Sequence, residues 1–201
     1  MDNVEKFVKF CETEFGREVM DREAEYIEGE FKSCRRILDV GCGIGSIEER
    51  LPGLNITGID RSKEMLKEAR QRVDGVLVVG NAESLPFKEN SFDAVFYLTI
   101  LEFLDDYEKA IREGHRVLTK NGKFLAMILN PDSDYFREHT QREGSYFNRI
   151  KHTNLDKIKE CASHYFLTQE EYFLGIKEGR TFTHQDKRYA SLYILKGMEN
   201  G

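Results

Sequence analysis

Short apolar runs alternate with amphipathic segments along the middle of the chain. Runs of this kind are typical of strands that are buried on both faces of a parallel sheet. The segments between them place apolar residues at helical spacing, and Ser62 is suited to begin one of these helices as its N-cap. Strands that alternate with helices predict βαβ units, and therefore a doubly wound α/β sheet with helices on both faces. The apolar runs are residues 37–40, 56–59, 76–79, 94–98 and 124–129.

No repeat, low-complexity tract or linker divides the chain, so the sequence predicts one domain over residues 1–201. Residues 1–34 carry two amphipathic helical patterns and precede a core of residues 35–130. Residues 131–166 form a polar, weakly helical insertion rich in aromatic side chains. This composition suits a substrate lid, but the aromatic side chains are equally suited to bury the insertion's own helices. Residues 167–201 are expected to close the domain with a helix and a hairpin.

The expected closing helix depends on local signals. Thr168 and Glu171 form a capping-box pair, and Gly179 is suited to end the helix. The polar segment 185–188 then separates two short runs, which predicts an antiparallel hairpin. The predicted fold is a mostly parallel, seven-stranded sheet with an antiparallel C-terminal hairpin. The two strands of this hairpin are predicted over residues 180–184 and 189–196.

Composition narrows the classes of function. With 40% hydrophobic and 33% charged residues, the 201-residue chain has the composition of a soluble globular protein, which we expect in the cytoplasm. No apolar run approaches the roughly 18 residues that span a bilayer, and the acidic N-terminus lacks a signal-peptide pattern. The net charge of −6 argues against a nucleic-acid partner, because phosphates require clustered lysine and arginine. Four scattered cysteines without a C-x-x-C pair predict neither disulfides nor a metal site.

A glycine-rich turn follows the first predicted strand. Gly41, Gly43 and Gly45 lie between that strand and a helix, at the edge where open α/β sheets bind ligands. Glycines there let the backbone approach a ligand closely. A dinucleotide-binding fingerprint would require glycine at position 46, which Ser46 occupies. Taken alone, the turn is also compatible with a purely structural role.

Polar side chains mark the ends of three successive strands. Asp39 lies inside the first strand, where a buried carboxylate needs a partner; a ligand ammonium group and nearby backbone N–H groups are both suitable. Asp60 ends the second strand, where a carboxylate can accept hydrogen bonds from both hydroxyls of a ribose. Its alternative role, capping the next helix, is better filled by Ser62. Asn81 follows the third strand, and its carbonyl oxygen can accept from the exocyclic amine of adenine.

These segments together resemble a known family. In order and spacing, ILDVGCGIG, GIDRSKEML and GNAESLPFKENSFDAVF are similar to the motifs of class I S-adenosylmethionine-dependent methyltransferases. The resemblance is greatest to the type 11 group, which includes ubiquinone- and menaquinone-biosynthesis-like methyltransferases, and it is firm over about 35–130. It implies a Rossmann-like methyltransferase fold with S-adenosyl-L-methionine as the cofactor and S-adenosyl-L-homocysteine as the product. Asn81 departs from the family pattern, because an aspartate is usual there, and 119–122 replace a Pro-Gly-Gly turn.

By position, the resemblance assigns parts of the cofactor to particular residues. Gly41, Cys42 and Gly43 line its methionine end, and Asp60 holds the ribose. The residues expected beside the adenine are Arg61, Met65, Asn81 and Ala82, and Leu98 closes the near side. The full set of expected cofactor contacts is Asp39, Gly41, Cys42, Gly43, Gly45, Asp60, Arg61, Met65, Asn81, Ala82, Glu83 and Leu98.

No catalytic residue is obvious in the sequence. Methyl transfer from a sulfonium is a direct displacement that chiefly requires positioning and exclusion of water. Tyr97, Thr99 and Glu102 lie at or just after the end of the fourth strand, where an acceptor is expected, but each is also suited to packing or capping. The candidates for substrate contact, all in the insertion, are Tyr135, Tyr146 and Arg149.

Three functions remain open on the sequence alone. A methyltransferase for a small-molecule acceptor fits the compact, acidic chain. A methyltransferase for protein or RNA would need an open cleft, and for RNA a basic surface. A non-catalytic module would bind S-adenosylmethionine without access to its methyl group. A nicotinamide-dependent oxidoreductase is disfavoured by Ser46 and Asp39.

Overall fold

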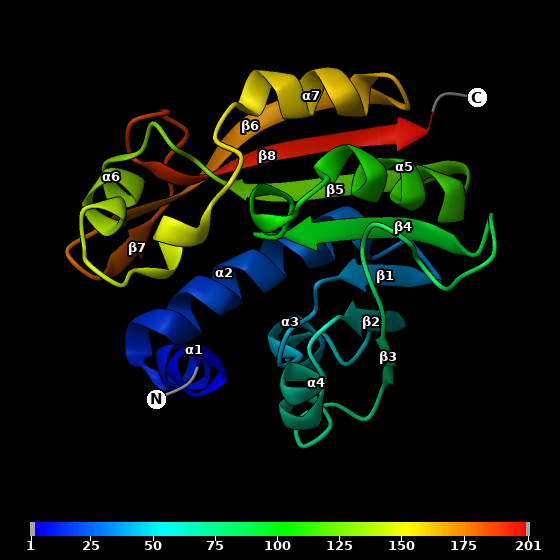
Figure 1. The fold of residues 1–201 in the computed structure, drawn as a ribbon, viewed down its shortest axis with the longest axis horizontal. Helices are drawn as coiled ribbons and strands as arrows, with labels where there is room; N and C mark the ends of the chain where they lie inside the picture. Colours follow the sequence, from blue (N-terminus) through cyan, green and yellow to red (C-terminus); the bar gives the residue numbers. More distant parts are fainter. Residues whose placement is uncertain (1–2, 200–201) are drawn as a thin grey trace.

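The computed structural model describes residues 3–199 as a single sheet with helices on both faces (Figure 1). The helices are α1 (Asn3–Glu12), α2 (Glu14–Phe31), α3 (Ser46–Arg50), α4 (Lys63–Ala69), α5 (Tyr107–Val117), α6 (Asp134–Thr140) and α7 (Leu155–Ser163), with the 3-10 helices η1 (Leu101–Phe103) and η2 (Tyr146–Arg149). The strands are β1 (Ile37–Val40), β2 (Ile56–Asp60), β3 (Val76–Val79), β4 (Phe92–Leu98), β5 (Leu118–Leu129), β6 (Phe166–Lys177), β7 (Arg180–Phe182) and β8 (Ala190–Glu199). The predicted doubly wound α/β class is confirmed.

The sheet has the strand order β3-β2-β1-β4-β5-β8-β6-β7. Strands β1 to β5 are parallel, whereas β8 and β6 are antiparallel to their neighbours. The prediction of seven strands is wrong, because the sheet contains eight. The additional strand is β6, which occupies the segment that the sequence predicts as a helix.

Tertiary partners explain why β6 is a strand. Both residues of the expected capping box have partners outside the predicted helix: the Thr168 hydroxyl lies 2.9 Å from that of Ser163 at the end of α7, and Glu171 accepts from the distant Tyr26 hydroxyl at 2.5 Å. Lys196 of β8 pairs with the Glu171 carboxylate at 2.9 Å across the two strands. These contacts and a long pairing with β8 outweigh a capping signal that is worth only about 1 kcal/mol.

The C-terminal hairpin is real, but it is formed by different strands from those predicted. Strands β6 and β7 make the tight hairpin, and β8 pairs with the other edge of β6. Glu178 and Gly179 have φ of 52° and 71°, as in a two-residue turn with both central residues left-handed. Gly179 therefore ends a strand, whereas the sequence assigns it to the end of a helix.

Alternating residues of the central strands divide the core into two layers. In β4, Val95 and Tyr97 belong to a cluster with α5 and α7, whereas Ala94 and Phe96 belong to a cluster with α1, α2 and α3. This division is what side chains that alternate across a sheet produce. Figure 1 shows the same layers, with α5 and α7 on one face of the sheet and α2 on the other.

The carboxyl ends of the parallel strands meet at one edge of the sheet. In Figure 1, α1, α6 and β7 lie around the side toward which β1 and β4 point. Helix α1 reaches the turn after β1, because a Cβ placed on Gly43 would lie 3.9 Å from the ring of Phe7. The fold thus places the polar strand ends beneath the N-terminal helices and the insertion.

Candidate functional site

The glycine-rich turn is fixed to β2 and packed against the segment after β4. Gly41 N donates to the carbonyl oxygen of Ile59 at 2.7 Å. Gly41, Gly43 and Gly45 have φ of 88°, 55° and 74°, a region in which residues with a Cβ are strained. At Gly41 a Cβ would also lie 2.3 Å from the side chain of Ile100. Glycine is therefore required here both by conformation and by the packing of Ile100.

Three carboxyl groups lie around this turn. Asp39 in β1 is 3% exposed, and Glu48 in α3 is 6% exposed. A Cβ placed on Gly58 would lie 2.7 Å from Glu48 Oε1 and 2.8 Å from Cys42 Sγ, so the Glu48 carboxylate lies directly beside the turn. Apart from the carboxyl group of Asp39, no described side chain donates to the Glu48 oxygens. Asp60 completes the group, and its charge acts on Asp39.

Burial and mutual repulsion hold protons in this group. Burial raises the pKa of Asp39 well above its usual range, and the charges of Glu48 and Asp60 raise it further. Burial also raises the pKa of Glu48, to about 7. A proton kept by one of these two carboxyl groups lets it donate to the other. A cationic ligand would stabilise the ionised forms, whereas a phosphate would be repelled.

Cys42 does not behave as a nucleophile. It is 8% exposed, and burial followed by the charges of Asp39 and Glu48 raises the pKa of its thiol. The thiolate is the reactive form of cysteine, so this environment makes the side chain inert near neutral pH.

Glu48 was not expected from the sequence, although a signal for it exists. Ile44, Ile47 and Leu51 are buried at helical spacing, and position 48 belongs to the same stripe. A charged residue on an apolar stripe is costly unless it has a partner or a function.

Asp60 lies at the carboxyl end of β2, as the sequence indicates. Its Oδ2 accepts from Gly43 N at 3.0 Å, and its Oδ1 accepts from Ser62 N at 2.7 Å. Ser62 itself caps α4, because its side chain accepts from Met65 N at 3.1 Å. A carboxylate offers about four lone-pair positions, so Asp60 can tie the turn to α4 and still accept from ribose hydroxyls.

The loop after β3 is organised by its own side chains. Asn81 Oδ1 accepts from Glu83 N at 3.0 Å, which leaves the amide nitrogen and one lone pair free. Glu83 is turned toward the start of α5, where its Oε1 accepts from Asp106 N at 3.2 Å. This contact gives Glu83 a role in the fold. The other expected adenine contacts are exposed or half-buried, and they are Arg61, Met65 and Ala82.

The segment after β4 separates the glycine turn from the insertion. The half-buried Leu98 ends β4. Thr99 has φ of 49°, which is uncommon for a β-branched residue, and its N–H donates to the carbonyl oxygen of Met127 at 2.8 Å. The next residue, Ile100, packs on Gly41.

Tyr97 takes the packing role and does not face the acceptor. Its side chain is fully buried, and its hydroxyl donates to the carbonyl oxygen of Ala110 at 2.7 Å. A Cβ placed on Gly114 would lie 2.4 Å from that hydroxyl, so Tyr97 fills a space in α5.

Glu102 is buried at the end of the sheet, and only one of its two carboxylate oxygens has a hydrogen-bond partner among the described residues. It is 1% exposed, and its Oε1 accepts from Leu129 N at 2.9 Å. Its Oε2 has no hydrogen-bond partner among the described residues. Burial raises the pKa of Glu102 to about 7, against the opposing effect of the hydrogen bond from Leu129. Its main-chain carbonyl accepts from Lys151 N at 2.8 Å and His152 N at 3.1 Å, so the insertion is anchored on η1.

The insertion brings Tyr146 and Arg149 to this edge. The rings of Tyr146 and Phe103 have their centroids 4.6 Å apart, and the Arg149 guanidinium lies 5.4 Å from the centre of the Tyr146 ring. Tyr146 is 52% exposed, but partial desolvation raises its pKa; the charge of Arg149 opposes this shift, and the charges of Glu102 and Asp60 add to it. Tyr146 therefore lies within electrostatic reach of both carboxylates.

Tyr135 faces a different wall of the same edge. Burial raises its pKa to about 12, and the charge of Glu23 in α2 adds to the effect. Glu23 is 4% exposed, and its Oε2 lacks a hydrogen-bond partner among the described residues. Burial raises the pKa of Glu23 to about 8, although the charge of Arg50 opposes this.

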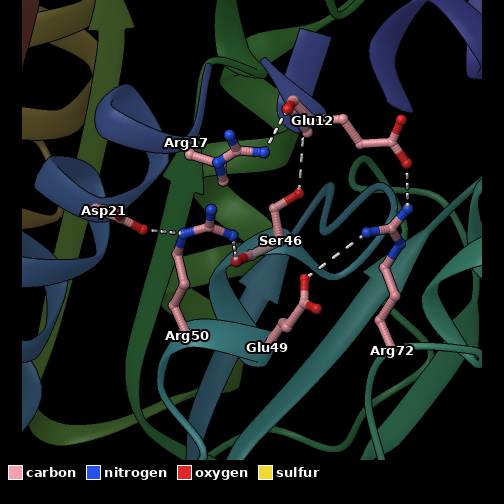
Figure 2. A pocket seen from close by; sticks show the side chains of 8 residues that line it. Glu12, Arg17, Asp21, Ser46, Glu49, Arg50 and Arg72 are labelled. Atoms are coloured by element: carbon pink, nitrogen blue, oxygen red, sulfur yellow. Dashed lines mark hydrogen bonds and ion pairs between the residues drawn. The ribbon is translucent and has the colours of Figure 1, made fainter. Parts of the chain in front are cut away.

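A cavity of about 270 Å³ lies between α1, the start of α2 and α3 (Figure 2). Figure 2 shows that its arginines are turned toward groups of the chain itself. Arg50 pairs with Asp21 at 2.6 Å, and Arg72 lies 3.9 Å from Glu12. Arg17 donates to the main-chain carbonyl of Glu12. These cations are therefore already paired within the chain. The pairs around the cavity connect the N-terminal helices to α3 and to Arg72.

Within residues 3–199, no three histidine, cysteine, aspartate or glutamate side chains are arranged to hold a metal ion. In the same part of the chain, no helix combines the length and the apolar character needed to cross a membrane.

The regions of similarity to known proteins differ in length. The uncharacterized protein MJ1123 of Methanocaldococcus jannaschii is 31% identical over 171 residues, which cover 83% of this chain and 78% of that protein. A demethylmenaquinone methyltransferase of Thermotoga maritima is 36% identical over 101 residues, which cover 48% of this chain and 44% of that protein. The chain spans about half the length of several curated relatives that it matches, from 42% to 59%.

Similarity in structure extends over nearly the whole chain. A crystal structure from Thermotoga maritima, described as an S-adenosylmethionine-dependent methyltransferase and possible histamine N-methyltransferase, has a TM-score of 0.83. It is 20% identical and covers 98% of this chain and 96% of its own, so it shows the common fold. The sequence profile of the family described as methyltransferase domain matches residues 38–126, from β1 to the middle of β5. The chain therefore belongs to the methyltransferase-domain family and has the Rossmann-like fold of S-adenosylmethionine-dependent methyltransferases.

Proposed function

We propose that this chain binds S-adenosyl-L-methionine and transfers its methyl group to a small-molecule acceptor. The observation that carries the proposal is the group of three carboxyl groups around the glycine turn, formed by Asp39, Glu48 and Asp60. Their charge favours a ligand with cationic groups and opposes the pyrophosphate of a dinucleotide. S-adenosylmethionine fits this chemistry, because it carries a sulfonium and an ammonium group beside a single carboxylate.

Each end of the cofactor has residues suited to it. Asp60 accepts from the ribose hydroxyls with the lone pairs that Gly43 and Ser62 leave free. Asp39 and Glu48 act on the ammonium end through the turn. The residues assigned to the adenine are Arg61, Met65, Asn81 and Ala82, with Leu98 on the near side. When bound, the cofactor supplies an activated methyl group, so the protein's task is to position the acceptor and exclude water.

The acceptor is assigned to the space between η1 and the insertion 131–166, which acts as a lid. The lid is anchored where Lys151 N and His152 N donate to the Glu102 carbonyl oxygen. Tyr135, Tyr146 and Arg149, the residues that the sequence indicates, offer the acceptor aromatic and cationic contacts. Helix α1 covers the glycine turn from the other side, through Phe7. A site covered from both sides suits a small molecule better than a folded protein or RNA.

The names of similar proteins support a small acceptor without agreeing on its chemistry. One relative is named for demethylmenaquinone, and one structural neighbour is described as a possible methyltransferase for histamine. Both names refer to small molecules, one a quinone and the other an amine.

The test is transfer of label from S-adenosylmethionine that carries a tritiated methyl group. The purified chain is incubated with a metabolite extract that has been separated into fractions below and above roughly 1 kDa. We expect label in a small-molecule product of the lower fraction. Label only in protein or RNA of the upper fraction would overturn the small-molecule acceptor, and binding without any transfer would indicate a non-catalytic module.

A further inference from the structure

We propose that the methyl acceptor is an amine, held as its ammonium against Glu102, and that Glu102 is the catalytic residue that takes the ammonium proton. This inference rests on the proposed methyltransferase function and deepens it by naming the substrate class. Its starting point is a carboxylate oxygen, Glu102 Oε2, that is buried without a hydrogen-bond partner among the described residues.

The position of Glu102 is that of an acceptor site. Helix η1 begins three residues after the end of β4, and Ile100 in the connection packs on Gly41 of the cofactor turn. The hydrogen bond from Leu129 N to Oε1 at 2.9 Å holds the carboxylate across the end of β5. Its charge reaches Tyr146, which also lies in the field of Asp60. Glu102 therefore belongs to the segment that packs on the cofactor turn, two residues after Ile100.

Among residues 3–199, no cationic side chain acts on this carboxylate. The nearest candidates along the insertion are engaged elsewhere: Arg149 lies over the ring of Tyr146, and Lys151 pairs with Asp105. The His152 ring lies 3.0 Å, through Nε2, from the carbonyl oxygen of Leu104. Glu23 differs in this respect, because the charge of Arg50 acts on it. A buried carboxylate without a cation is costly, so a cationic ligand would stabilise it.

The surroundings of Glu102 also suit an organic cation. The rings of Phe103 and Tyr146 lie together, with centroids 4.6 Å apart, at the surface of η1. Aromatic rings attract cations through their faces, and they bury the hydrocarbon part of an amine. An alcohol would offer the Glu102 carboxylate only a neutral hydrogen-bond donor. An ionised carboxylic acid would repel it.

The proposed reaction is balanced with the methyl donor as the only co-reactant. The Glu102 carboxylate accepts one proton from the ammonium group, which leaves a lone pair on the nitrogen. This lone pair forms the N–C bond while the C–S bond of the sulfonium breaks, and the electron pair of that bond stays on the sulfur. The products are an N-methylammonium ion and the neutral thioether, and Glu102 later releases its proton to water.

The test uses Glu102→Gln, which keeps an oxygen for Leu129 N and removes the negative charge. Its matched control is Glu113→Gln, because Glu113 also accepts from a backbone N–H, that of Leu85 at 2.8 Å, but from α5. The probes are aliphatic and aromatic, primary and secondary amines, among them ethanolamine, histamine and 2-phenylethylamine. Their counterparts are 2-phenylethanol and phenylacetate. Binding of each probe to the complex with S-adenosylhomocysteine is measured by calorimetry, and methyl transfer is measured with labelled cofactor.

We expect amines to bind and to be methylated, and the alcohol and the acid to be inert. In Glu102→Gln, amine affinity should fall at least about tenfold and kcat at least about 100-fold, the usual range for loss of a general base. Affinity for S-adenosylmethionine should stay within about threefold of the unmodified chain. Glu113→Gln should retain both amine binding and kcat.

Several outcomes would overturn the inference. These are a complex that binds none of the amines, methylation of the alcohol or the acid in preference to amines, and unchanged amine affinity in Glu102→Gln. A fall in cofactor affinity equal to the fall in amine affinity would assign Glu102 to the cofactor. Failure of the unmodified chain to bind S-adenosylhomocysteine at all is a separate result, and it would reject the proposed function itself.

Discussion

Two groups of buried carboxylates at one edge of the sheet differ in how their charge is balanced. At the glycine turn, Asp39, Glu48 and Asp60 act on one another, and their repulsion is relieved by a shared proton or by a bound cation. Glu102 stands apart from this group with one backbone donor and a free oxygen. We therefore propose two different ligands for these carboxyl groups: the cluster suits the cationic end of a cofactor, and the single carboxylate suits a cationic acceptor.

The largest expected effect comes from a substitution at the contact between the glycine turn and the segment that carries Glu102. Gly41→Ala puts a Cβ into a left-handed residue and 2.3 Å from the side chain of Ile100, which precedes Glu102 in the same segment. Strain and overpacking together should lower the free energy of unfolding by about 2–5 kcal/mol. Urea unfolding measures the loss.

Gly29→Ala is the matched control for that substitution. Gly29 lies in α2, and a Cβ placed there would meet no atom within 4 Å. Because alanine is favoured over glycine inside a helix, the control should be stabilised by about 0.5–1 kcal/mol. Equal stabilities of Gly41→Ala and the unmodified chain would show that Ile100 does not pack on the turn as described.

A smaller effect is expected when one carboxyl group of the cluster, that of Glu48, is replaced by an amide. Burial raises the pKa of Glu48 from 4.5 in its ordinary state to about 7, so the folded chain binds a proton that the unfolded chain releases. The stability that this proton gives is present below about pH 4.5 and is lost as the pH rises to about 7. Glu48→Gln lacks this titration. As the pH rises from 4.5 to 8, the variant should therefore lose less unfolding free energy than the unmodified chain.

Urea unfolding at the two pH values provides the measurement, with Glu49→Gln as the control. Glu49 belongs to the same helix, but its side chain is 43% exposed and lies 3.8 Å from Arg72. Its substitution removes one negative charge from the exposed face of α3 and leaves Glu48 in place. A pH dependence in Glu48→Gln that is equal to that of the unmodified chain would contradict the assignment of the proton to Glu48.

The smallest expected effect comes from Tyr97→Phe, which tests whether Tyr97 or Glu102 is the catalytic residue. Tyr97→Phe removes a buried hydroxyl that donates to the Ala110 carbonyl oxygen, which should cost about 1 kcal/mol of stability. Methyl transfer should continue at the same kcat in the folded variant, because this hydroxyl faces α5. A large fall in kcat without a fall in stability would return Tyr97 to the catalytic candidates.

The parts of the fold that were predicted are those determined by local sequence. Ser62 caps α4 as expected, and the glycine turn and Asp60 lie at the ends of β1 and β2. Strand β6 was not predicted, because its pairing with β8 and the partners of Glu171, Tyr26 and Lys196, lie far away in the sequence and do not enter a local capping signal. Local propensity is overridden by tertiary pairing in such segments.

The sequence predicted which strand ends form the site, but not how the buried carboxyl groups of the site are paired. The sequence places Asp39 and Asp60 near the turn, because the carboxyl ends of parallel strands meet at one edge. It does not reveal that Glu48 turns inward beside Gly58, or that one oxygen of Glu102 lacks a partner. Both facts depend on the packing of side chains from several elements, which helical spacing alone does not determine.

The most direct test of cofactor binding is calorimetry with S-adenosylmethionine, S-adenosylhomocysteine and NADH on the unmodified chain and on Asp60→Asn. Asp93→Asn is the control, because Asp93 also accepts from two backbone N–H groups, those of Arg35 and Arg36 at 3.1 Å, at the opposite end of β1. We expect both sulfur ligands to bind with a Kd of about micromolar order, about tenfold or more weaker in Asp60→Asn and unchanged in Asp93→Asn. No heat with either sulfur ligand in a folded sample, or binding of NADH alone, would contradict the assignment of this turn to S-adenosylmethionine.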